Sequence, residues 1–361
     1  MLRRKPFSLP YAQAVPTLAA LLRGGEAAPA DPAELAEGAV YHNVAGFVLA
    51  AADEGRISLP GEVAGRLERR FAVQTLRASL LRRELPEVVA ACSNPPLLLK
   101  GPAVADRFYA DPRLRPFVDL DLLVPRGELR GDVAALVAAG FKPVEAFRPG
   151  FGEELGHDVH LVRGAGAGRV DVELHWRVGD DRLAEALSYE LLRAGAADLV
   201  GGALVPAVAE QLLVLAVHLL GDRAKRLCWI NDLALTGSAA TAEEWLRAFE
   251  LARELSLLWV LHRALDYPAE LLGSDRARPL PAGPRPAFGP LRAAEELDLR
   301  ASTHVGRLAA LPWRERPGYV RDVLVPTRAG LEGTVGGDGA PTWKLVARHL
   351  HRAVAGILPR R

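Results

Sequence analysis

The hydrophobic positions along the chain change their spacing twice. Over residues 1–93, apolar residues recur at helical spacing with arginines between them, as in VAGRLERRFAVQTLRASLLRRELPEVVAAC. This spacing predicts amphipathic helices. Over residues 94–180, short apolar runs bounded by glycine and proline predict strands, and from residue 181 to 361 the helical spacing returns. We therefore expect an α+β fold in which a core with a small mixed β-sheet is flanked by N-terminal helices and a C-terminal helical domain.

Three apolar runs of the central region have the character of strands. They are PPLLLKG, FVDLDLLV over residues 117–124, and RVDVELHW over residues 169–176. PAVADRFYA follows the first run, and its proline suits the first turn of a helix. In the C-terminal domain, a Pro/Arg-rich loop is expected near residues 274–290, where SDRARPLPAGPRPAFGP interrupts the helical pattern.

Two carboxylates interrupt the strand expected over residues 117–124. Asp119 and Asp121 are two residues apart, so both project from one face of a strand. Like charges held close together in a buried strand need strong compensation. A divalent cation supplies it, and hard oxygen ligands suit Mg²⁺. The pair is therefore a candidate metal site.

The strand over residues 169–176 offers a third carboxylate. Asp171, Glu173 and His175 fall on one face of it. If this strand lies beside the first, either carboxylate completes a cluster of three acids. Such a cluster can hold two Mg²⁺ ions, roughly 3.5–4 Å apart, for in-line displacement at phosphorus.

Basic residues lie next to these acids in the sequence. Lys100 and Gly101 form a turn before the expected helix, and a helix N-terminus is a favourable place for phosphates. Lys100 would add a point charge to a triphosphate. Arg115, just ahead of the aspartate pair, is a second candidate phosphate contact.

The ordered set of loop, helix, aspartate pair and acidic strand resembles the polymerase-β-like nucleotidyltransferase superfamily. More closely, LLLKGPAVADRFYADPRLRPFVDLDLLV followed by VELHWRV resembles an uncharacterised bacterial nucleotidyltransferase family. That family has a KG loop, a DxDLLV strand and a strand with an acid followed by Leu-His-Trp. The resemblance covers roughly residues 40–270 and includes an HL…WIxDL segment.

The resemblance implies roles for individual residues. Lys100 and Gly101 match the nucleotide-binding loop, Asp119 and Asp121 match the metal pair, and Glu173 matches the third acid. The broader superfamily has Gly-Ser in its loop, so a Lys-Gly loop implies different contacts with the phosphates. Glu173 is preferred as the third metal ligand, although Asp171 could share this role.

The implied activity is that of an Mg²⁺-dependent nucleotidyltransferase. It would move NMP, with AMP as the expected group, from an NTP such as ATP to a hydroxyl of an acceptor that the sequence does not identify, and release pyrophosphate. One alternative is a catalytically weak or inactive protein of the same fold that acts as a protein-interaction or antitoxin-like module. Another is a metal-dependent phosphoester hydrolase that uses His157 and His160 with the same acids.

Composition and charge limit the kinds of partner and the compartment that we expect for this protein. The 45 basic and 44 acidic residues give a net charge of +1, which offers no general attraction for nucleic acid or an anionic membrane. Two cysteines cannot form a disulfide framework, which favours a reducing compartment. The most apolar helical run, LLVLAVHLL, is far shorter than the ~20 residues that span a bilayer. We therefore expect a cytoplasmic protein without a membrane partner.

Several polar residues are further candidates for the site. His160 enters the strand expected beside residues 169–176 and could line the cleft, although a surface turn also explains it. His175 completes the Leu-His-Trp motif. Asp232 is explained equally by a polar contact between helices and by an acceptor pocket. His218 lies on a nearly all-apolar helix, which is more typical of a core histidine satisfied by one hydrogen bond than of a catalyst.

Overall fold

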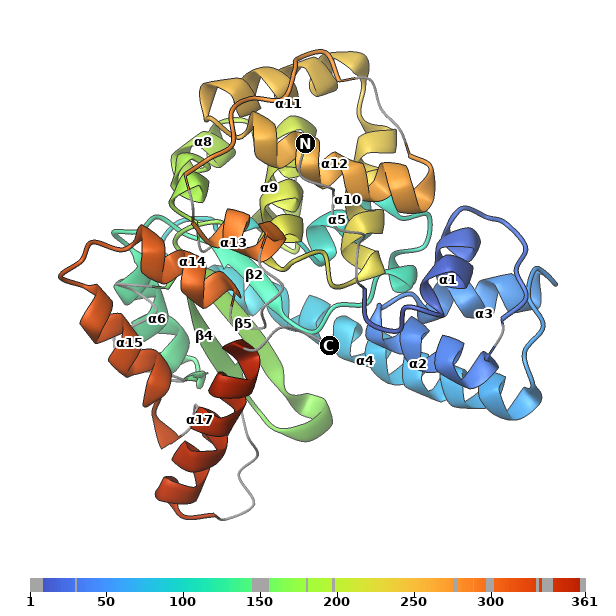
Figure 1. Ribbon diagram of the computed structural model, residues 1–361, viewed down its shortest axis with the longest axis horizontal. Helices are drawn as coiled ribbons and strands as arrows, with labels where there is room; N and C mark the ends of the chain where they lie inside the picture. Colours follow the sequence, from blue (N-terminus) through green and yellow to red (C-terminus); the bar gives the residue numbers. More distant parts are fainter. Residues whose placement is uncertain are drawn as a thin grey trace.

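The computed structural model describes most of the chain. The described residues are 9–29, 31–144, 156–179, 181–196, 199–274, 278–287, 289–296, 302–328, 331–332 and 340–357. Figure 1 shows a sheet in the middle of the molecule with helices around it. This mixed α+β architecture confirms the predicted fold class.

The described strands form one seven-stranded mixed sheet. Its order is β3-β4-β5-β2-β1-β7-β6. β2 pairs in parallel with β5 and antiparallel with β1, and β4 pairs antiparallel with β5. The strand bounds are β1 Leu97–Leu98, β2 Leu120–Leu123, β3 Lys142–Pro143, β4 Asp158–Arg163, β5 Val170–His175, β6 Leu199–Val200 and β7 Ala203–Leu204.

One face of the sheet packs on two helices, α4 (Gly61–Ala90) and α6 (Leu129–Ala138). Alternate residues of the central strands point to this face because side chains alternate along a strand. The resulting core contains Leu120 and Leu122 of β2 together with apolar residues of α4, α6 and β5. α4 also contacts the N-terminal helices, so it joins them to the sheet.

The opposite face belongs to a larger core. Leu97 of β1 and Leu123 of β2 enter it, together with residues of the N-terminal helices and of the helices after β7. These helices are α1 Val15–Leu22, α2 Pro32–Tyr41, α3 Ala45–Asp53, α5 Pro102–Phe108, α8 Tyr189–Ala194, α9 Val208–Gly221, α10 Leu227–Ala239, α11 Ala242–Glu254 and α12 Leu258–Leu272. One core thus draws on all three predicted regions, and the boundaries near residues 93 and 180 stay a prediction.

α9 is the centre of the C-terminal helices. It contacts α10, α11, α12 and α13, and most of its residues are buried. Gln211, a buried polar residue of α9, donates from Nε2 to the carbonyl oxygen of Leu99 at 2.8 Å. This bond ties α9 to the end of β1, because a buried amide needs a partner.

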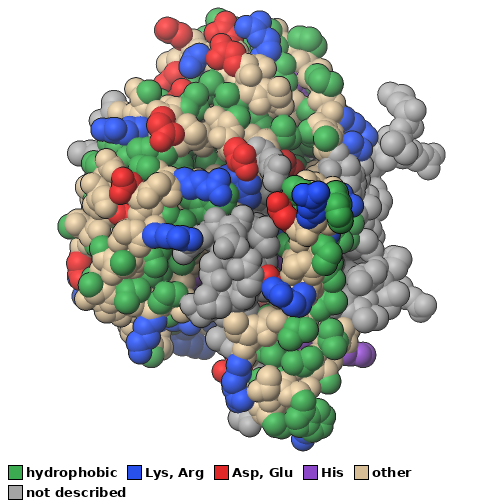
Figure 2. Space-filling model, turned by 90° about the vertical axis from the view of Figure 1, so that its left-hand side faces the viewer, with side chains coloured by type: hydrophobic (Ala, Val, Ile, Leu, Met, Phe, Trp, Pro, Cys, Tyr) green, Lys and Arg blue, Asp and Glu red, His purple; other side chains and the backbone are tan. Residues whose placement is uncertain are grey.

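The remaining helices follow the predicted Pro/Arg-rich loop. Residues 278–287, within the range predicted for that loop, contain neither helix nor strand. In Figure 1, α13 and α14 lie near the sheet, and α15 and α17 extend to the lower left. The bounds are α13 Pro290–Glu296, α14 Ser302–Ala310, α15 Arg316–Leu324 and α17 Thr342–Ile357. On the face shown in Figure 2, basic and acidic side chains are interspersed, in keeping with the net charge of +1.

Candidate active site

The two acidic strands lie side by side. β2 and β5 run parallel, and in their register Asp121 stands opposite Glu173. This arrangement confirms that the strand with the aspartate pair and the strand with the third acid are neighbours. β2 begins at Leu120, so the expectation that Asp119 lies within the strand is wrong by one residue. Asp119 lies in the bend before it, because the first ladder pair joins Leu120 to Val172.

Three side chains converge at this point. Ligand atoms of Asp121, Glu173 and His175 all lie within 4.8 Å of one another. His175 Nε2 is 3.2 Å from Asp121 Oδ1 and 3.5 Å from Glu173 Oε2. The Nζ atom of Lys100 is 2.9 Å from the same Asp121 oxygen. Asp121 is only 1% exposed, whereas the Glu173 side chain is 29% exposed, so the cluster is open toward solvent on the Glu173 side.

The cations and carboxylates of the cluster shift one another's ionisation. Burial alone would lower the pKa of His175, but its hydrogen bonds to Asp121 and Glu173 raise it to about 10. Burial would likewise lower the pKa of Lys100, and the surrounding carboxylates raise it above its usual value. Burial would raise the pKa of Glu173, but His175 and Lys100 lower it to about 2. At neutral pH Glu173 is therefore an ionised carboxylate beside two cations, His175 and Lys100.

The pKa of Asp119 is shifted in the opposite direction to that of Glu173. Burial and the neighbouring charge of Asp121 raise the pKa of Asp119 to about 7, although Lys100 opposes this shift. The shift shows that Asp119 senses Asp121, Glu173 and Lys100, as an aspartate pair in one site must. A cation beside the pair would stabilise both as carboxylates.

The Lys-Gly loop approaches the acids because β1 ends there. The backbone N–H of Leu99 donates to the carbonyl oxygen of Asp121 at 3.0 Å. Gly101 then adopts φ 61° and ψ −113° at the start of α5, a conformation that only glycine adopts readily. A Cβ at this position would also lie 3.4 Å from the Phe117 ring. The turn thus holds Lys100 against Asp121.

Asp171 lies on the same face of β5 as Glu173 but has different partners. Its carboxylate accepts from Arg77 at 2.7 Å and from Arg169 at 2.6 Å, and it lies 2.9 Å from His160 Nε2. Burial would raise the pKa of Asp171, but the hydrogen bonds with His160 and Arg169 hold it below its usual range. The described contacts of Asp171 are therefore with cations of the protein, and those of Glu173 are with His175 in the cluster.

Arg115 and Asp232 form a separate buried pair. Arg115 donates from Nε and Nη2 to the two carboxylate oxygens of Asp232, each at 2.7 Å, and both residues are almost fully buried. The Tyr109 hydroxyl donates to Asp232 at 2.7 Å. The partners of Asp232 are thus Arg115, in the loop ahead of β2, and Tyr109, at the end of α5. The polar contact between helices and the acceptor pocket suggested for Asp232, like the contact of Arg115 with phosphate, stay predictions.

The two histidines of the hydrolase alternative, His157 and His160, have different contacts in the structure. His160 is opposite Glu173 in the β4–β5 register and is bound to Asp171. His157 lies beside the cluster, with its ring centroid 5.3 Å from that of His175. Burial lowers the pKa of His157 to about 4, so it is neutral at pH 7.

Two residues near the site carried no signal in the sequence. Asp222 Oδ2 lies 3.1 Å from His218 Nδ1 at the end of α9, which gives His218 its polar partner. Burial and the positive charge of Lys100 hold the pKa of His218 well below its usual value. Arg307 of α14 acts in the same way on the pKa of His157. The effects of Lys100 on His218 and of Arg307 on His157 join residues distant in sequence, whereas Asp222 lies one helical turn after His218.

The comparison with protein families agrees with this geometry. The model of a family described as an uncharacterised nucleotidyltransferase matches residues 28–273, about two thirds of the chain. The chain belongs to this family. The family indicates transferase activity, so the protein is assigned as an enzyme. A search of the curated proteins found no match.

The donor set of this nucleotidyltransferase suits a divalent metal. Two carboxylates and an imidazole nitrogen lie within reach of one position, and all three are common metal ligands.

No helix in the described ranges is long and apolar enough to cross a membrane.

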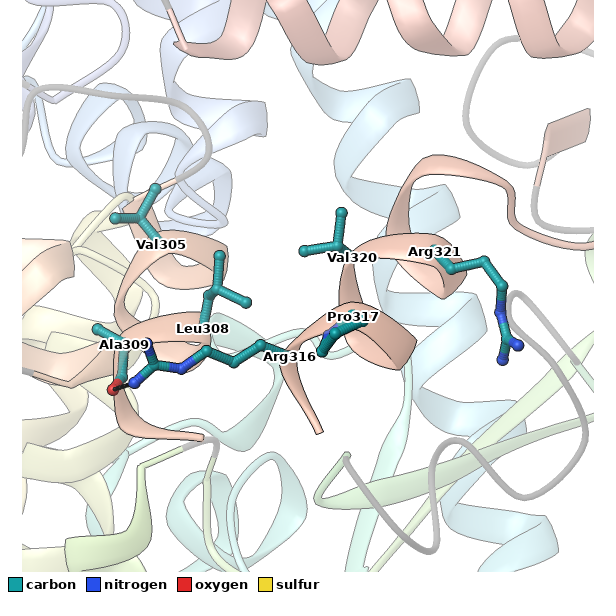
Figure 3. Close-up of a pocket in the computed structure, with 7 residues that line it drawn as sticks. All are labelled: Val305, Leu308, Ala309, Arg316, Pro317, Val320 and Arg321. Carbon is teal, nitrogen blue, oxygen red and sulfur yellow. Dashed lines mark hydrogen bonds between the residues drawn. The ribbon is translucent and has the colours of Figure 1, made fainter. Parts of the chain in front are cut away.

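A groove of about 720 Å³ lies away from these acids, between α14 and α15. Figure 3 shows Val305 and Leu308 of α14 facing Pro317 and Val320 of α15, and Arg316 donates to the carbonyl oxygen of Ala309 at 3.1 Å. None of the predicted site residues lines this groove.

Proposed function

We propose that this protein is a Mg²⁺-dependent nucleotidyltransferase that transfers NMP, with AMP as the first candidate, from an NTP to a hydroxyl of an acceptor. The observation that carries the proposal is the position of Asp121 opposite Glu173, with Lys100 bound to Asp121. This combination places a metal site beside a cation that can bind phosphate.

Each residue has a distinct role in the proposed reaction. Asp119 and Asp121 would hold metal at the triphosphate, and Glu173 would hold metal nearer the acceptor. Lys100 and the N–H of Gly101 would bind the β- and γ-phosphates. When bound, two Mg²⁺ ions would supply charge neutralisation at the phosphates and lower the pKa of the attacking hydroxyl.

The bond changes follow from these positions. The acceptor oxygen forms a bond to the α-phosphorus while the bond from that phosphorus to the bridging oxygen of the β-phosphate breaks. Pyrophosphate leaves with the electron pair of that bond. Glu173, which is ionised and partly exposed, accepts the proton of the hydroxyl. The chain contributes mainly positioning and charge stabilisation, as in other phosphoryl transfers.

The proposal is tested by calorimetric titration of the full-length protein with ATP, in the presence and absence of Mg²⁺. We expect Mg²⁺-dependent binding that the double variant Asp119→Asn/Asp121→Asn loses. Asp106→Asn is the matched control, because Asp106 is a partly exposed aspartate that pairs with Arg82 on the protein surface. Equal binding by the double variant and the wild type would refute the assignment of the site.

A second measurement separates transfer from the alternatives. With α-labelled ATP and a cell extract as the source of acceptor, a transferase labels an acceptor and releases pyrophosphate. A hydrolase would release phosphate, and a non-catalytic module would do neither.

The two free cysteines, Cys92 and Cys228, support a reducing compartment, and we propose a cytoplasmic location.

A further inference from the structure

His175 occupies an unusual place for a histidine in a site built from acids. Its side chain is 4% exposed, and Nε2 faces Asp121 and Glu173 at 3.2 and 3.5 Å. Among the described residues, the other ring nitrogen, Nδ1, has no hydrogen-bond partner. The polar contacts of this imidazole are therefore made through Nε2, and both are with acids of the cluster.

The backbone explains why the imidazole reaches this position. Glu173 and His175 are two residues apart on β5, so they share one face. β2 runs parallel beside them and puts Asp121 opposite Glu173. The burial of the ring and the regular strand beneath it hold Nε2 in place before any ion binds, which reduces the ordering cost of coordination.

The donor set differs from an all-oxygen Mg²⁺ site. Mg²⁺ strongly prefers oxygen ligands and usually keeps several waters. An imidazole nitrogen suits metals further along the first transition series, and sites with nitrogen bind those metals more tightly. One nitrogen beside two carboxylates therefore favours a metal such as Mn²⁺ over Mg²⁺.

We propose that His175, once the ion has displaced the proton from Nε2, is a direct ligand of the metal held by Asp121 and Glu173, and that this position takes Mn²⁺ in preference to Mg²⁺. The inference deepens the proposed function and rests on it for the roles of these acids. The second ion, at Asp119, Asp121 and the phosphates, has oxygen ligands only and remains the Mg²⁺ position. The two positions thus differ in metal preference.

The test is pulsed electron paramagnetic resonance of Mn²⁺ bound to the metal-stripped full-length protein. A directly coordinated histidine imposes an echo modulation from its ¹⁴N nucleus, and we expect this modulation in the wild type. Protein labelled with [¹⁵N]histidine must show the ¹⁵N pattern instead. This measurement requires no substitution, so it does not depend on the folding of a variant.

Variants then assign the nitrogen to one residue. His175→Gln should lose the modulation and bind Mn²⁺ about tenfold or more weakly, since even second-shell partners contribute this much. His160→Gln is the matched control, because His160 lies opposite Glu173 but binds Asp171. It should keep the modulation. Circular dichroism of each variant verifies that it is folded.

The possible outcomes separate this inference from the proposed function. Bound Mn²⁺ without histidine modulation, modulation that survives in His175→Gln, or no Mn²⁺ binding would overturn the role of His175. Tighter binding of Mg²⁺ than of Mn²⁺ would overturn the stated preference. Histidine modulation without any binding of ATP would support His175 as a ligand and refute the nucleotidyltransferase proposal.

Discussion

The guanidinium of Arg115 and the carboxylate of Asp232 form a buried bidentate ion pair between the loop ahead of β2 and α10. Tyr109 donates a further hydrogen bond to Asp232, and Asn231 donates to the Tyr109 hydroxyl at 3.2 Å. The pair fixes the chain four residues before Asp119. We infer that it positions the aspartate pair against the C-terminal helices.

We predict that Arg115→Met destabilises the protein by about 3–5 kcal/mol, because it leaves the Asp232 charge buried without a partner. The double variant Arg115→Met/Asp232→Leu should recover most of this loss, since it removes both charges. Urea unfolding measures both. If Arg115→Met instead keeps its stability and loses only affinity for ATP, Arg115 is a phosphate contact, as the sequence predicted.

The two strands that carry the acids of the site could be predicted from the sequence pattern. Alternation in FVDLDLLV and RVDVELHW was sufficient to predict two strands, and the metal site required that they be neighbours, as they are. These features are local, because the period of two in a strand fixes which side chains share a face. The start of β2 was not predictable, since it depends on where the ladder with β5 begins.

Asp171 and Glu173 provide a second prediction. Glu173→Gln should weaken the binding of Mn²⁺ by about tenfold or more, because it removes a carboxylate of the cluster. Asp171→Asn should leave this affinity unchanged and lower the free energy of unfolding by about 2 kcal/mol, since it weakens hydrogen bonds to Arg77 and Arg169. Calorimetry measures the Mn²⁺ affinity of both variants, and urea unfolding measures their stability. Loss of metal binding in Asp171→Asn alone would reverse the assignment.

The difference between these two acids could not be read from the sequence. They are equivalent in a strand pattern, and only the fold shows that Arg77 of α4 reaches Asp171. Those two residues are 94 positions apart, and the partners Arg115 and Asp232 are 117 apart. An arginine-rich chain offers many cations for each carboxylate, so a single sequence does not select the pairs.

Gly101 provides a third prediction. Gly101→Ala should cost about 1–3 kcal/mol of stability, because its backbone conformation is one that L-residues avoid. Relief of that strain would move Lys100, so the affinity for ATP should also fall. Gly65→Ala is the control, since Gly65 lies within α4 and its added Cβ would meet only the tip of Arg69, at 3.6 Å. That helical substitution should stabilise the protein by up to about 1 kcal/mol. Equal stability of the two variants would show that the backbone conformation of Gly101 does not disfavour alanine.

His42 provides a fourth prediction, on the pH dependence of stability. This residue is fully buried at the end of α2, and its Nε2 lies 2.9 Å from the carbonyl oxygen of Pro10. The N–H of Leu227 donates to Nδ1 at 3.3 Å. Because a carbonyl only accepts and an N–H only donates, these contacts fix the neutral ring with its proton on Nε2. Burial, assisted by Arg226, lowers the pKa of His42 to about 4 from 6.5, against the bond to Pro10.

The sign of the effect follows from these pKa values. Between pH 6.5 and 4 the unfolded chain takes up a proton at His42 and the folded protein does not, so stability falls as the pH falls through this window. The total loss from this group is about 3 kcal/mol, and above pH 6.5 it contributes no slope. Urea unfolding at intervals from pH 7.5 to 4.5 should therefore show a shallower fall for His42→Gln than for the wild type. His351→Gln, at an exposed position, should follow the wild type, and parallel curves for all three proteins would refute the role of His42.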